Sequence, residues 1–443
     1  MTVITRFAPS PTGLIHIGNV RTALLCYLIA RQNNGKFMLR LDDTDTERSK
    51  EEYATAIKSE LKWLGLDWDI FARQSDRLAR YEEIKQKLIS DDLLYPCYES
   101  AEELEVKRKM LINRGLPPIY DRAALRLTEQ QKADFEKQGI QPHWRFKLDD
   151  TKTISWEDEI KGTITFEAKN LSDPVLIRAN GNPTYMLPSA IDDVDFDITH
   201  VVRGEDHVSN TAIQIQLFEA IGGKIPTFAH SALMKAKDGK ISKREGGYDI
   251  AAMREEGIEV LTINSFLARL GTSDPVEPRT SMQEIIDNFD IKRFTKNAAI
   301  YEYIELERLN PKIIHKFSFN DVKDRAEMKG IDEEFFESVK ANLNKLSEIQ
   351  QWWEICKKQL TPIIDDADFA KTASELLPDG KWDENTWSEW TSKVKEATGR
   401  KGKDLFMPIR KALTARDNGP ELKLILPLIG NEKATARLNG KAA

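Results

Sequence analysis

The sequence predicts an α/β protein in which a doubly wound sheet is interrupted by an α+β insertion and followed by a helical region. Three observations support this fold class. Strand and helix patterns alternate over residues 1–92, short strand-like runs dominate residues 93–183, and the chain beyond about residue 245 reads as helical throughout. With 443 residues, the chain is long enough for two to four domains, each with a sizeable core.

The first predicted strand covers residues 2–7, whose β-prone side chains suit a buried position. Pro9 and Pro11 prevent the strand from continuing, and Gly13 allows a tight turn. Apolar residues recur at helical spacing from residue 19 onward. A strand, a turn and a helix therefore follow one another at the start of the chain.

The residues between this strand and this helix have the chemistry of a phosphate site. His16, Gly18 and Asn19 should lie at the helix N-terminus, where free backbone N–H groups and the helix dipole favour anions. His16 could donate a hydrogen bond to a triphosphate, and Gly18 would let an adenosine ring approach the backbone. Taken alone, the same residues also fit an ordinary strand–turn–helix with a buried histidine.

The next strand is expected at residues 37–41, followed by an amphipathic helix through Tyr53, Ile57, Leu61 and Leu64. Between them stand Asp42, Asp43 and Asp45, which suit either a Mg²⁺ site or capping of the strand end. We favour the capping role, because ATP usually brings its own Mg²⁺.

The insertion and the second half of the sheet are predicted from shorter patterns. The insertion should contain a charged helix at about 101–113 and strands at 144–147, 163–166 and 174–178. The main sheet should resume with strands at 184–187 and 200–203, before a helix through Ile213, Leu217 and Ile221.

A second motif lies at residues 240–244, Lys-Ile-Ser-Lys-Arg, between Gly239 and the Gly246-Gly247 pair. Flanking glycines predict a mobile loop that carries three cations. Such a loop suits nucleotidyl transfer, in which positioning and charge neutralisation on a pyrophosphate leaving group do most of the work. On its own, the loop would more often be a solvated basic segment.

The helical region contains one clear apolar stripe and a basic end. The stripe is expected to be core, and it consists of Phe336, Val339, Leu343, Leu346, Ile349 and Trp353. The whole chain has a net charge of −7, but residues 393–443 contain 12 Lys/Arg and 5 Asp/Glu, a local balance of +7. This basic end is compatible with phosphate contacts and equally with a basic face that has no partner.

The composition argues against a secreted, membrane-spanning or disulfide-rich protein. No signal peptide and no apolar run of membrane-spanning length is apparent. Cys26, Cys97 and Cys356 are scattered, which suggests neither a disulfide framework nor a closed zinc site. We therefore expect a soluble, cytoplasmic protein.

Together, the two motifs resemble those of bacterial glutamyl-tRNA synthetases, which are class I aminoacyl-tRNA synthetases. The segment at residues 7–19 resembles the HIGH motif and the 240–244 loop resembles the KMSKS motif, which handle ATP in this class. The resemblance covers nearly the full length, with further support at residues 39–45, 181–185 and 202–210. It implies a Rossmann-type catalytic domain split by an acceptor-stem-binding insertion, followed by all-α stem-contact and anticodon-binding domains.

The predicted pattern and the resemblance give the same domain plan. We expect the first catalytic half at 1–92, the insertion at 93–183, the second catalytic half at 184–232, a stem-contact domain with the KISKR loop at 233–318, and anticodon-binding domains at 319–443. Some relatives carry a cysteine-rich zinc knuckle in the insertion. Here that stretch retains only Cys97, so no structural zinc is expected.

The resemblance also implies site residues. Catalytic roles fall to His16, Lys240 and Lys243. ATP contacts fall to Pro11, Thr12, Gly13, His16, Gly18, Asn19, Glu205, His207, Ser242, Lys243 and Arg244. Glutamate contacts fall to Arg6, Ser10, Asp42, Tyr185 and Arg203. Candidates for tRNA contact are Arg400, Lys401, Lys403, Arg410 and Lys411.

The glutamate assignments have a physical basis. Arg6 and Arg203 offer guanidinium forks that match a side-chain carboxylate and leave neutral glutamine poorly paired. Without the resemblance, surface salt bridges would be the simpler reading of both arginines. Asp42 would take the α-ammonium group, although the family more often carries glutamate there, which places the charge one methylene further out.

The implied activity is ATP-dependent ligation of L-glutamate to tRNA(Glu) through glutamyl-adenylate, with Mg²⁺ supplied with ATP and a monomer as the default state. Charging of tRNA(Gln) as well is left open. The motif at 7–13 and the helical C-terminal region argue against a glutaminyl-tRNA synthetase. The roughly 200 residues after Lys243 argue against a glutamyl-queuosine synthetase, which lacks the anticodon domains. A non-catalytic paralogue would not need both ATP motifs, and a small-molecule nucleotidyltransferase would not need the helical region.

Overall fold

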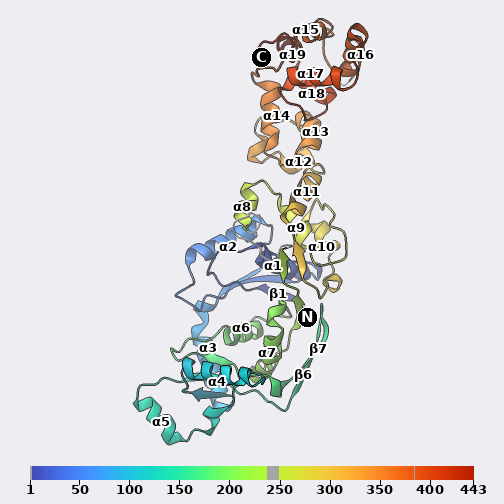
Figure 1. The fold of residues 1–443 in the computed structure, drawn as a ribbon. Coiled ribbons are helices and arrows are strands. Elements are labelled where there is room, and N and C mark those ends of the chain that lie inside the picture. The colour runs from blue at the N-terminus through green and yellow to red at the C-terminus, as the bar shows by residue number, and fades with distance from the viewer. Residues whose placement is uncertain (1, 237–248, 384) are drawn as a thin grey trace. The chain divides into compact units, whose positions relative to one another are not determined.

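The computed structural model describes residues 2–236, 249–383 and 385–443 (Figure 1). These residues form two compact units. The first comprises Met1–Met253, Asn264–Glu277 and Ser281–Glu302, and the second comprises Arg254–Ile263, Pro278–Thr280 and Tyr303–Ala443. None of the helices in these described parts is long and apolar enough to cross a membrane.

A seven-stranded sheet organises the first unit, in the order β3-β2-β1-β9-β10-β6-β7. Its strands are β1 (Ile4–Phe7), β2 (Lys36–Leu41), β3 (Ile70–Arg73), β6 (Thr153–Asp158), β7 (Gly162–Glu167), β9 (His200–Gly204) and β10 (Thr227–Ser231). Every neighbouring pair is parallel except the β6–β7 hairpin. The parallel strands run outward on both sides of β1, as a doubly wound sheet requires, and the predicted fold class is confirmed.

Helices connect these strands and cover the sheet. They are α1 (Ile17–Gln32), α2 (Glu51–Trp63), α3 (Leu78–Ser90), α6 (Met186–Asp195) and α7 (Val208–Ile221). Helix α1 packs along β1 and β9, whereas α3, α6 and α7 pack against one another. The helical crossovers make these strands parallel. The carboxyl ends of β1, β2 and β9 therefore lie at one edge of the sheet.

Helix α6 corrects one prediction, because residues 184–187 were expected to be a strand. The β-prone pair Thr184-Tyr185 precedes the helix instead, and α6 buries Met186, Leu187, Ala190 and Ile191. This spacing of one, three and one residues follows the 3.6-residue period. Pro188 is tolerated because it lies in the first turn, where a missing N–H costs no helical hydrogen bond.

The segment between α3 and α6 forms a small antiparallel sheet with its own helices. The sheet has the order β4-β5-β8, with strands β4 (Leu94–Cys97), β5 (His143–Phe146) and β8 (Val175–Ile177). The helices are α4 (Ala101–Asn113) and α5 (Glu129–Lys137). Ser100 and Glu103 form a capping box that fixes the start of α4 where the sequence predicted it.

One predicted strand of the insertion lies elsewhere. Residues 163–166 belong to β7, which pairs with β6, and β6 extends the main sheet through the Asp158–Phe228 pair of β10. The predicted insertion at 93–183 therefore supplies two strands to the main sheet. Alternating polar and apolar residues reveal a strand but not its neighbour in the sheet.

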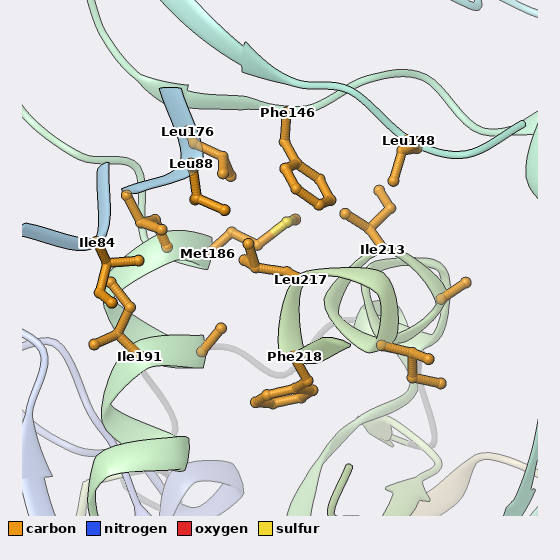
Figure 2. Packing of buried hydrophobic residues seen from close by; sticks show 14 of the residues in the cluster. Ile84, Leu88, Phe146, Leu148, Leu176, Met186, Ile191, Ile213, Leu217 and Phe218 are labelled. Atoms are coloured by element: carbon orange, nitrogen blue, oxygen red, sulfur yellow. The ribbon is translucent and has the colours of Figure 1, made fainter. Parts of the chain in front are cut away.

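A shared core joins the small sheet to the helices of the main sheet. Figure 2 shows Ile84 and Leu88 of α3, Phe146 of β5, Met186 of α6 and Leu217 of α7 pointing into the same space. All five are at most 6% exposed. At roughly 25 cal/mol per Å² of apolar surface removed from water, such burial is the main stabilising contribution.

The rest of the first unit contains a second correction. Residues beyond 245 were expected to be wholly helical, yet β12 (Ala299–Tyr301) pairs in parallel with β11 (Met234–Ala236). Among the described residues, three short α-helices lie between β11 and β12 in the chain: α8 (Ile250–Glu255), α9 (Val260–Leu267) and α10 (Met282–Asp287). A three-residue strand leaves almost no periodic signal.

In the second unit, all regular elements of the described residues are helical. They are α11 (Tyr303–Ile314), α12 (Phe319–Val322), α13 (Glu333–Val339), α14 (Glu348–Lys357), α15 (Ala367–Glu375), α16 (Thr386–Thr398), α17 (Lys403–Thr414), α18 (Leu422–Ile429) and α19 (Asn431–Leu438). The predicted apolar stripe does not lie on one helix. Phe336 and Val339 are on α13, Leu343 and Leu346 lie in the segment before α14, and Ile349 and Trp353 are on α14. All of these except the half-buried Trp353 are buried.

Candidate active site

A cavity of about 480 Å³ opens at the carboxyl ends of the central strands of the first unit. Its walls come from the ends of β1, β9 and β10, the start of α1, Asp42 after β2, and Tyr185 and Ser189 around the start of α6. In open α/β sheets this edge is the usual ligand-binding position. The cavity is therefore the candidate site.

His16 forms the N-cap of α1 at the mouth of this cavity. Its Nδ1 accepts a hydrogen bond from the Gly18 backbone N–H at 3.1 Å, and the Asn19 side-chain oxygen accepts one from the His16 N–H at 3.2 Å. Because Nδ1 is the acceptor, the neutral ring carries its proton on Nε2. The helix begins at Ile17, two residues before the predicted start.

Gly18 makes this cap possible. A Cβ added to Gly18 would lie 3.0 Å from both Cε1 and Nδ1 of His16. The glycine thus lets the imidazole fold back over the helix terminus, a role that sequence reasoning did not assign to it.

Two arginines line the cavity, Arg6 buried and Arg203 half-buried. Arg6 is 6% exposed, and its Nε donates to Asp193 Oδ1 at 3.0 Å. The Nε of Arg203 donates to His230 Nε2 at 3.3 Å, and its Nη2 donates to Thr211 Oγ1 at 2.5 Å. Burial lowers the pKa of Arg203 to about 10, with a further lowering by the nearby charge of Arg6. No Asp or Glu among the described residues forms an ion pair with Arg203.

Asp42 lies on the wall beside them, held by a buried cation. Arg40 is fully buried and grips both oxygens of Asp42, with Nε–Oδ1 at 2.7 Å and Nη2–Oδ2 at 3.1 Å. Arg40 also donates to Asp193 Oδ1 at 2.9 Å. Burial raises the pKa of Asp42, and the charge of Arg40 opposes that rise. Asp193 therefore links the two arginines at positions 6 and 40.

Tyr185 and His207 complete the polar wall. The Tyr185 hydroxyl accepts a short hydrogen bond from Asn210 Nδ2, and the same amide lies 3.3 Å from His207 Nδ1. Burial lowers the pKa of His207, and the positive charge of Arg203 lowers it further. Both rings present polar atoms beside the arginines.

Comparison with known proteins identifies the family. A family model for the catalytic domain of class I tRNA synthetases (E and Q) matches residues 2–308, and one for an anticodon binding domain matches residues 306–441. Glutamate–tRNA ligase 1 of Rickettsia massiliae (strain Mtu5) is 52% identical over 444 residues, covering 98% of this chain and 99% of the relative. The chain belongs to the glutamate–tRNA ligase family.

Other relatives match this chain along almost its whole length. Glutamate–tRNA ligase 1 of Ehrlichia ruminantium (strain Gardel) is 49% identical over 441 residues, covering 99% of both chains. The crystal structure of a glutamate tRNA ligase from Elizabethkingia meningosepticum in complex with its amino acid matches with a TM-score of 0.83 at 27% identity, covering 99% of both chains. The predicted resemblance to class I glutamyl-tRNA synthetases is confirmed.

Not every residue predicted for the site lines the cavity. His16, Gly18, Asn19 and His207 do, as do Arg6, Asp42, Tyr185 and Arg203. Ser10, Pro11, Thr12 and Gly13 lie outside its lining. Lys240, Ser242, Lys243 and Arg244 fall outside the described residues.

Glu205, predicted to contact ATP, has a structural role in the first unit. Its Oε2 pairs with Lys161 Nζ at 2.6 Å, and its Oε1 accepts the Leu233 backbone N–H at 3.1 Å. These contacts tie the β6–β7 turn and the segment after β10 to the end of β9. The carboxylate is thereby engaged within the protein.

Several site residues were missed by sequence reasoning. Arg21 lines the cavity and donates to the carbonyl oxygens of Ala232 and Leu270 at 2.9 and 3.1 Å. Asp193 accepts hydrogen bonds from both Arg6 and Arg40, and Arg40 in turn holds Asp42. The one available signal was their type, because charged residues inside apolar strand and helix patterns are rarely buried without a partner.

The acidic run after β2 serves the fold. Asp43 accepts hydrogen bonds from the Ser75 N–H at 2.8 Å and the Ser75 hydroxyl at 2.9 Å, and pairs with Arg73 at 3.1 Å. Asp45 pairs with Arg48 at 2.7 Å. These contacts agree with the strand-end role that we favoured over a Mg²⁺ site.

Three groups able to bind a metal meet in the small sheet. One ligand atom from each of Cys97, Glu99 and His143 lies within 4.8 Å of the others. The Tyr120 hydroxyl donates to Glu99 Oε1 at 2.8 Å. Structural zinc sites have four protein ligands, mostly cysteine and histidine, and this cluster offers one thiol. The expectation of no structural zinc stays a prediction, which metal analysis of the purified protein would test.

The five cations predicted for tRNA contact divide into two groups. Arg400 pairs with Asp366, Lys411 pairs with Asp365 at 2.9 Å, and Arg410 donates to the Pro420 carbonyl at 3.0 Å. These three are engaged within the second unit. Lys401 and Lys403, at the start of α17, are exposed.

Proposed function

We propose that this chain is a glutamate–tRNA ligase that joins L-glutamate to the 3′ end of tRNA(Glu) through glutamyl-adenylate, releasing AMP and pyrophosphate. One observation carries the choice of amino acid. Arg203 is a half-buried cation on the cavity wall that forms no ion pair with any described residue. A substrate carboxylate would supply the missing charge. The family and the names of the relatives support the same reaction.

Arg203 and Arg6 would bind the glutamate side chain. Arg6 uses Nε and Arg203 uses Nε and Nη2 for contacts within the protein, which leaves the Nη atoms of Arg6 and Nη1 of Arg203 for the substrate. The Tyr185 hydroxyl would add a hydrogen bond, and Ser10 would contact the amino-acid backbone. Neutral glutamine would leave a buried cation poorly paired, and sites built on such a required pairing reject near-isosteres strongly.

Asp42 would hold the α-ammonium group. Its carboxylate accepts two hydrogen bonds from Arg40, and a carboxylate has about four acceptor positions. Arg40 thus fixes the orientation of Asp42 while leaving lone pairs for the ammonium. This arrangement would place the α-carboxylate of glutamate toward the start of α1.

His16 would stabilise the phosphates of ATP. The cap fixes its proton on Nε2, the nitrogen that does not serve α1, and the helix N-terminus adds its own attraction for anions. Gly18 and Asn19 stand beside it, His207 lies across the cavity, and the remaining ATP contacts proposed from the sequence are Pro11, Thr12, Gly13, Ser242 and Arg244. ATP would bring Mg²⁺.

Activation then needs no covalent enzyme intermediate. The glutamate α-carboxylate attacks the α-phosphorus of ATP, and pyrophosphate leaves as the P–O bond breaks. His16, Lys240 and Lys243 neutralise the developing charge, with Lys243 the foremost ATP contact. The 2′-hydroxyl of the terminal ribose of tRNA then attacks the carbonyl carbon of the adenylate, and AMP leaves.

The domains around and after the catalytic sheet would bind tRNA. The insertion at 93–183 would bind the acceptor stem, residues 233–318 would contact the stem further along, and residues 319–443 would read the anticodon, consistent with the anticodon domain matched at 306–441. We propose a monomer that works in the cytoplasm and uses tRNA(Glu), with tRNA(Gln) as the second acceptor to be tested.

The test is charging of purified tRNA(Glu) and tRNA(Gln), in parallel, with labelled glutamate and MgATP. We expect charging of tRNA(Glu), and loss of charging in Arg203→Gln by at least about 100-fold in kcat/KM. Arg48→Gln, which removes an exposed arginine, is the matched control and should charge normally. Failure of the wild-type chain to charge either tRNA would overturn the proposal, and charging of both would indicate a relaxed enzyme.

A further inference from the structure

We propose that His230, Asp158 and Thr211 are positioning residues that hold Arg203 in place for a carboxylate and thereby contribute to the selection of glutamate over glutamine. This inference rests on the proposed function, because it takes Arg203 as the group that binds the substrate carboxylate. None of the three was a candidate from the sequence.

The backbone places these groups around one guanidinium. Arg203 of β9 and His230 of β10 are register partners, so their side chains lie on the same face of the sheet. His230 Nε2 accepts a hydrogen bond from Arg203 Nε at 3.3 Å, and Thr211 Oγ1 of α7 accepts one from Arg203 Nη2 at 2.5 Å. Nη1 has no hydrogen-bond partner among the described residues. Two contacts on one edge therefore fix the plane of the guanidinium and leave the Nη1 side for a ligand.

Asp158 determines which ring nitrogen of His230 carries the proton, from the side of the ring away from Arg203. His230 Nδ1 lies 2.5 Å from Asp158 Oδ2, at the end of β6, and both side chains are fully buried. Asp158 Oδ1 accepts backbone N–H groups of Ile160, Lys161 and His230 at 2.9 to 3.2 Å. Burial opposes ionisation of Asp158, but hydrogen bonds from His230 and the backbone outweigh it and lower its pKa. An ionised Asp158 makes Nδ1 the donor, so Nε2 of the neutral ring is the acceptor that Arg203 needs.

The two arginines of the site are held differently. Arg6 donates its Nε directly to the carboxylate of Asp193 at 3.0 Å. Arg203 donates to a neutral imidazole, and the charge of Asp158 lies on the far side of that ring. A carboxylate in direct contact with Arg203 would compete with the substrate carboxylate. The imidazole thus orients Arg203 without neutralising it.

Packing holds the ring in this role. His230 stacks on Phe228 with centroids 6.1 Å apart and planes at 18°, and Trp156 lies 6.3 Å away. Its side chain is fully buried, so the ring cannot turn away without opening the core. Such rigid support is what precise placement of a substrate-binding group requires.

Two matched pairs of variants of the full chain test the inference. Thr211→Val removes the hydroxyl at nearly constant volume, and Thr211→Ser keeps it. His230→Phe removes the acceptor and keeps a ring, whereas His230→Gln keeps an amide oxygen near the position of Nε2. The readouts are the KM for glutamate, the KM for ATP and the kcat/KM ratio for glutamate over glutamine, all in tRNA charging, with thermal unfolding of each variant.

We expect Thr211→Val and His230→Phe to raise the glutamate KM by on the order of 10- to 100-fold, because each removes a hydrogen bond to a charged group. The ATP KM should stay within about threefold, the glutamate-over-glutamine ratio should fall, and Thr211→Ser should restore the glutamate KM. An unchanged glutamate KM in Thr211→Val, or an equal rise in both KM values, would overturn the inference. If His230→Phe does not fold, the Thr211 pair still decides.

The same experiment separates this inference from the proposed function. If the wild-type chain does not charge tRNA with glutamate, the proposed function fails. If the wild type charges tRNA but the Thr211→Val and His230→Phe variants select glutamate as well as the wild type does, only the inference fails.

Discussion

His16 combines two tasks in one side chain, and each ring nitrogen has its own. Nδ1 caps α1, and this contact leaves the proton on Nε2. Substitution by alanine would remove both functions at once, so loss of activity in that variant would not distinguish them. Asparagine is a good N-cap residue and too short to replace Nε2.

We therefore expect His16→Asn and His16→Ala to lose pyrophosphate exchange similarly, by on the order of 100- to 1000-fold. Only His16→Ala should also lose stability, by about 1 kcal/mol, because it leaves the helix terminus uncapped. Exchange assays and urea denaturation of both variants check this. An active His16→Asn variant would show that the cap, not Nε2, is what activity needs.

How well the site could be predicted differs from residue to residue. The position of His16 and Gly18 at a helix N-terminus was predictable, because a strand, a turn and a helix follow one another in the local pattern. Arg6 and Arg203 needed the resemblance, since a lone arginine in a strand gives no hint of its partner. Asp158 and His230 are 72 residues apart in the chain, and only the sheet order brings them together.

At the scale of elements, a position where two backbone segments lie in close contact accepts only glycine without strain. Gly35, before β2, is an example, because a Cβ there would lie 2.2 Å from the Val3 carbonyl oxygen. That oxygen accepts the Lys36 N–H at 2.8 Å and so joins the start of β2 to the chain ahead of β1. The contact cannot be relieved by a side-chain movement.

We expect Gly35→Ala to lower the free energy of unfolding by about 1–3 kcal/mol, the usual cost of an overpacked site. Gly13→Ala is the matched control, because a Cβ there meets no atom within 4 Å. Urea denaturation followed by tryptophan fluorescence measures both. Equal stability of the two variants would mean that the loop before β2 relaxes.

The start of α17 carries two exposed lysines. Lys401 and Lys403 are exposed, whereas Arg400, Arg410 and Lys411 are engaged within the unit. Charge counting along the sequence could not distinguish these two groups, because a basic balance does not reveal which cations already have partners.

We expect the double variant Lys401→Ala, Lys403→Ala to weaken tRNA binding and to reduce the salt slope, log Kd against log salt concentration, by about one to two. Lys441→Ala, near the C-terminus, serves as a control that removes one exposed lysine elsewhere. Filter binding at several salt concentrations measures the slope. An unchanged slope in the double variant would place the phosphate contacts elsewhere.

At the scale of the molecule, buried histidines couple stability to pH. Burial lowers the pKa of His143, His200, His207 and His230 below the ordinary value of 6.5. As the pH falls through 6.5, the unfolded chain takes up protons at these rings before the folded chain does. The unfolded state is thereby favoured, and the loss of stability ends at the lower folded-state pKa values.

We expect the free energy of unfolding to fall by on the order of 2–4 kcal/mol between pH 7.5 and 5.5, since one pKa unit corresponds to about 1.4 kcal/mol. Urea denaturation at intervals across this range provides the measurement, and His200→Gln should show a shallower decline. Stability that is flat or increases toward pH 5.5 would contradict the assignment of neutral histidines.

The fold as a whole was more predictable than its sheet order. Long periodic segments such as α1, α2 and α7 were found because their apolar spacing is local. The strand predicted at 184–187 and the missed β12 are short, and for such segments tertiary contacts outweigh local preference.

The β6–β7 hairpin has a practical consequence for anyone who shortens the chain. Removing residues 93–183 as one block would strip two strands from the main sheet, expose the edge of β10 as a template for aggregation, and delete Asp158 from behind His230. A truncated enzyme should instead lose residues 98–142, between β4 and β5, and keep the hairpin. A minimal catalytic chain therefore has to be cut according to the sheet order.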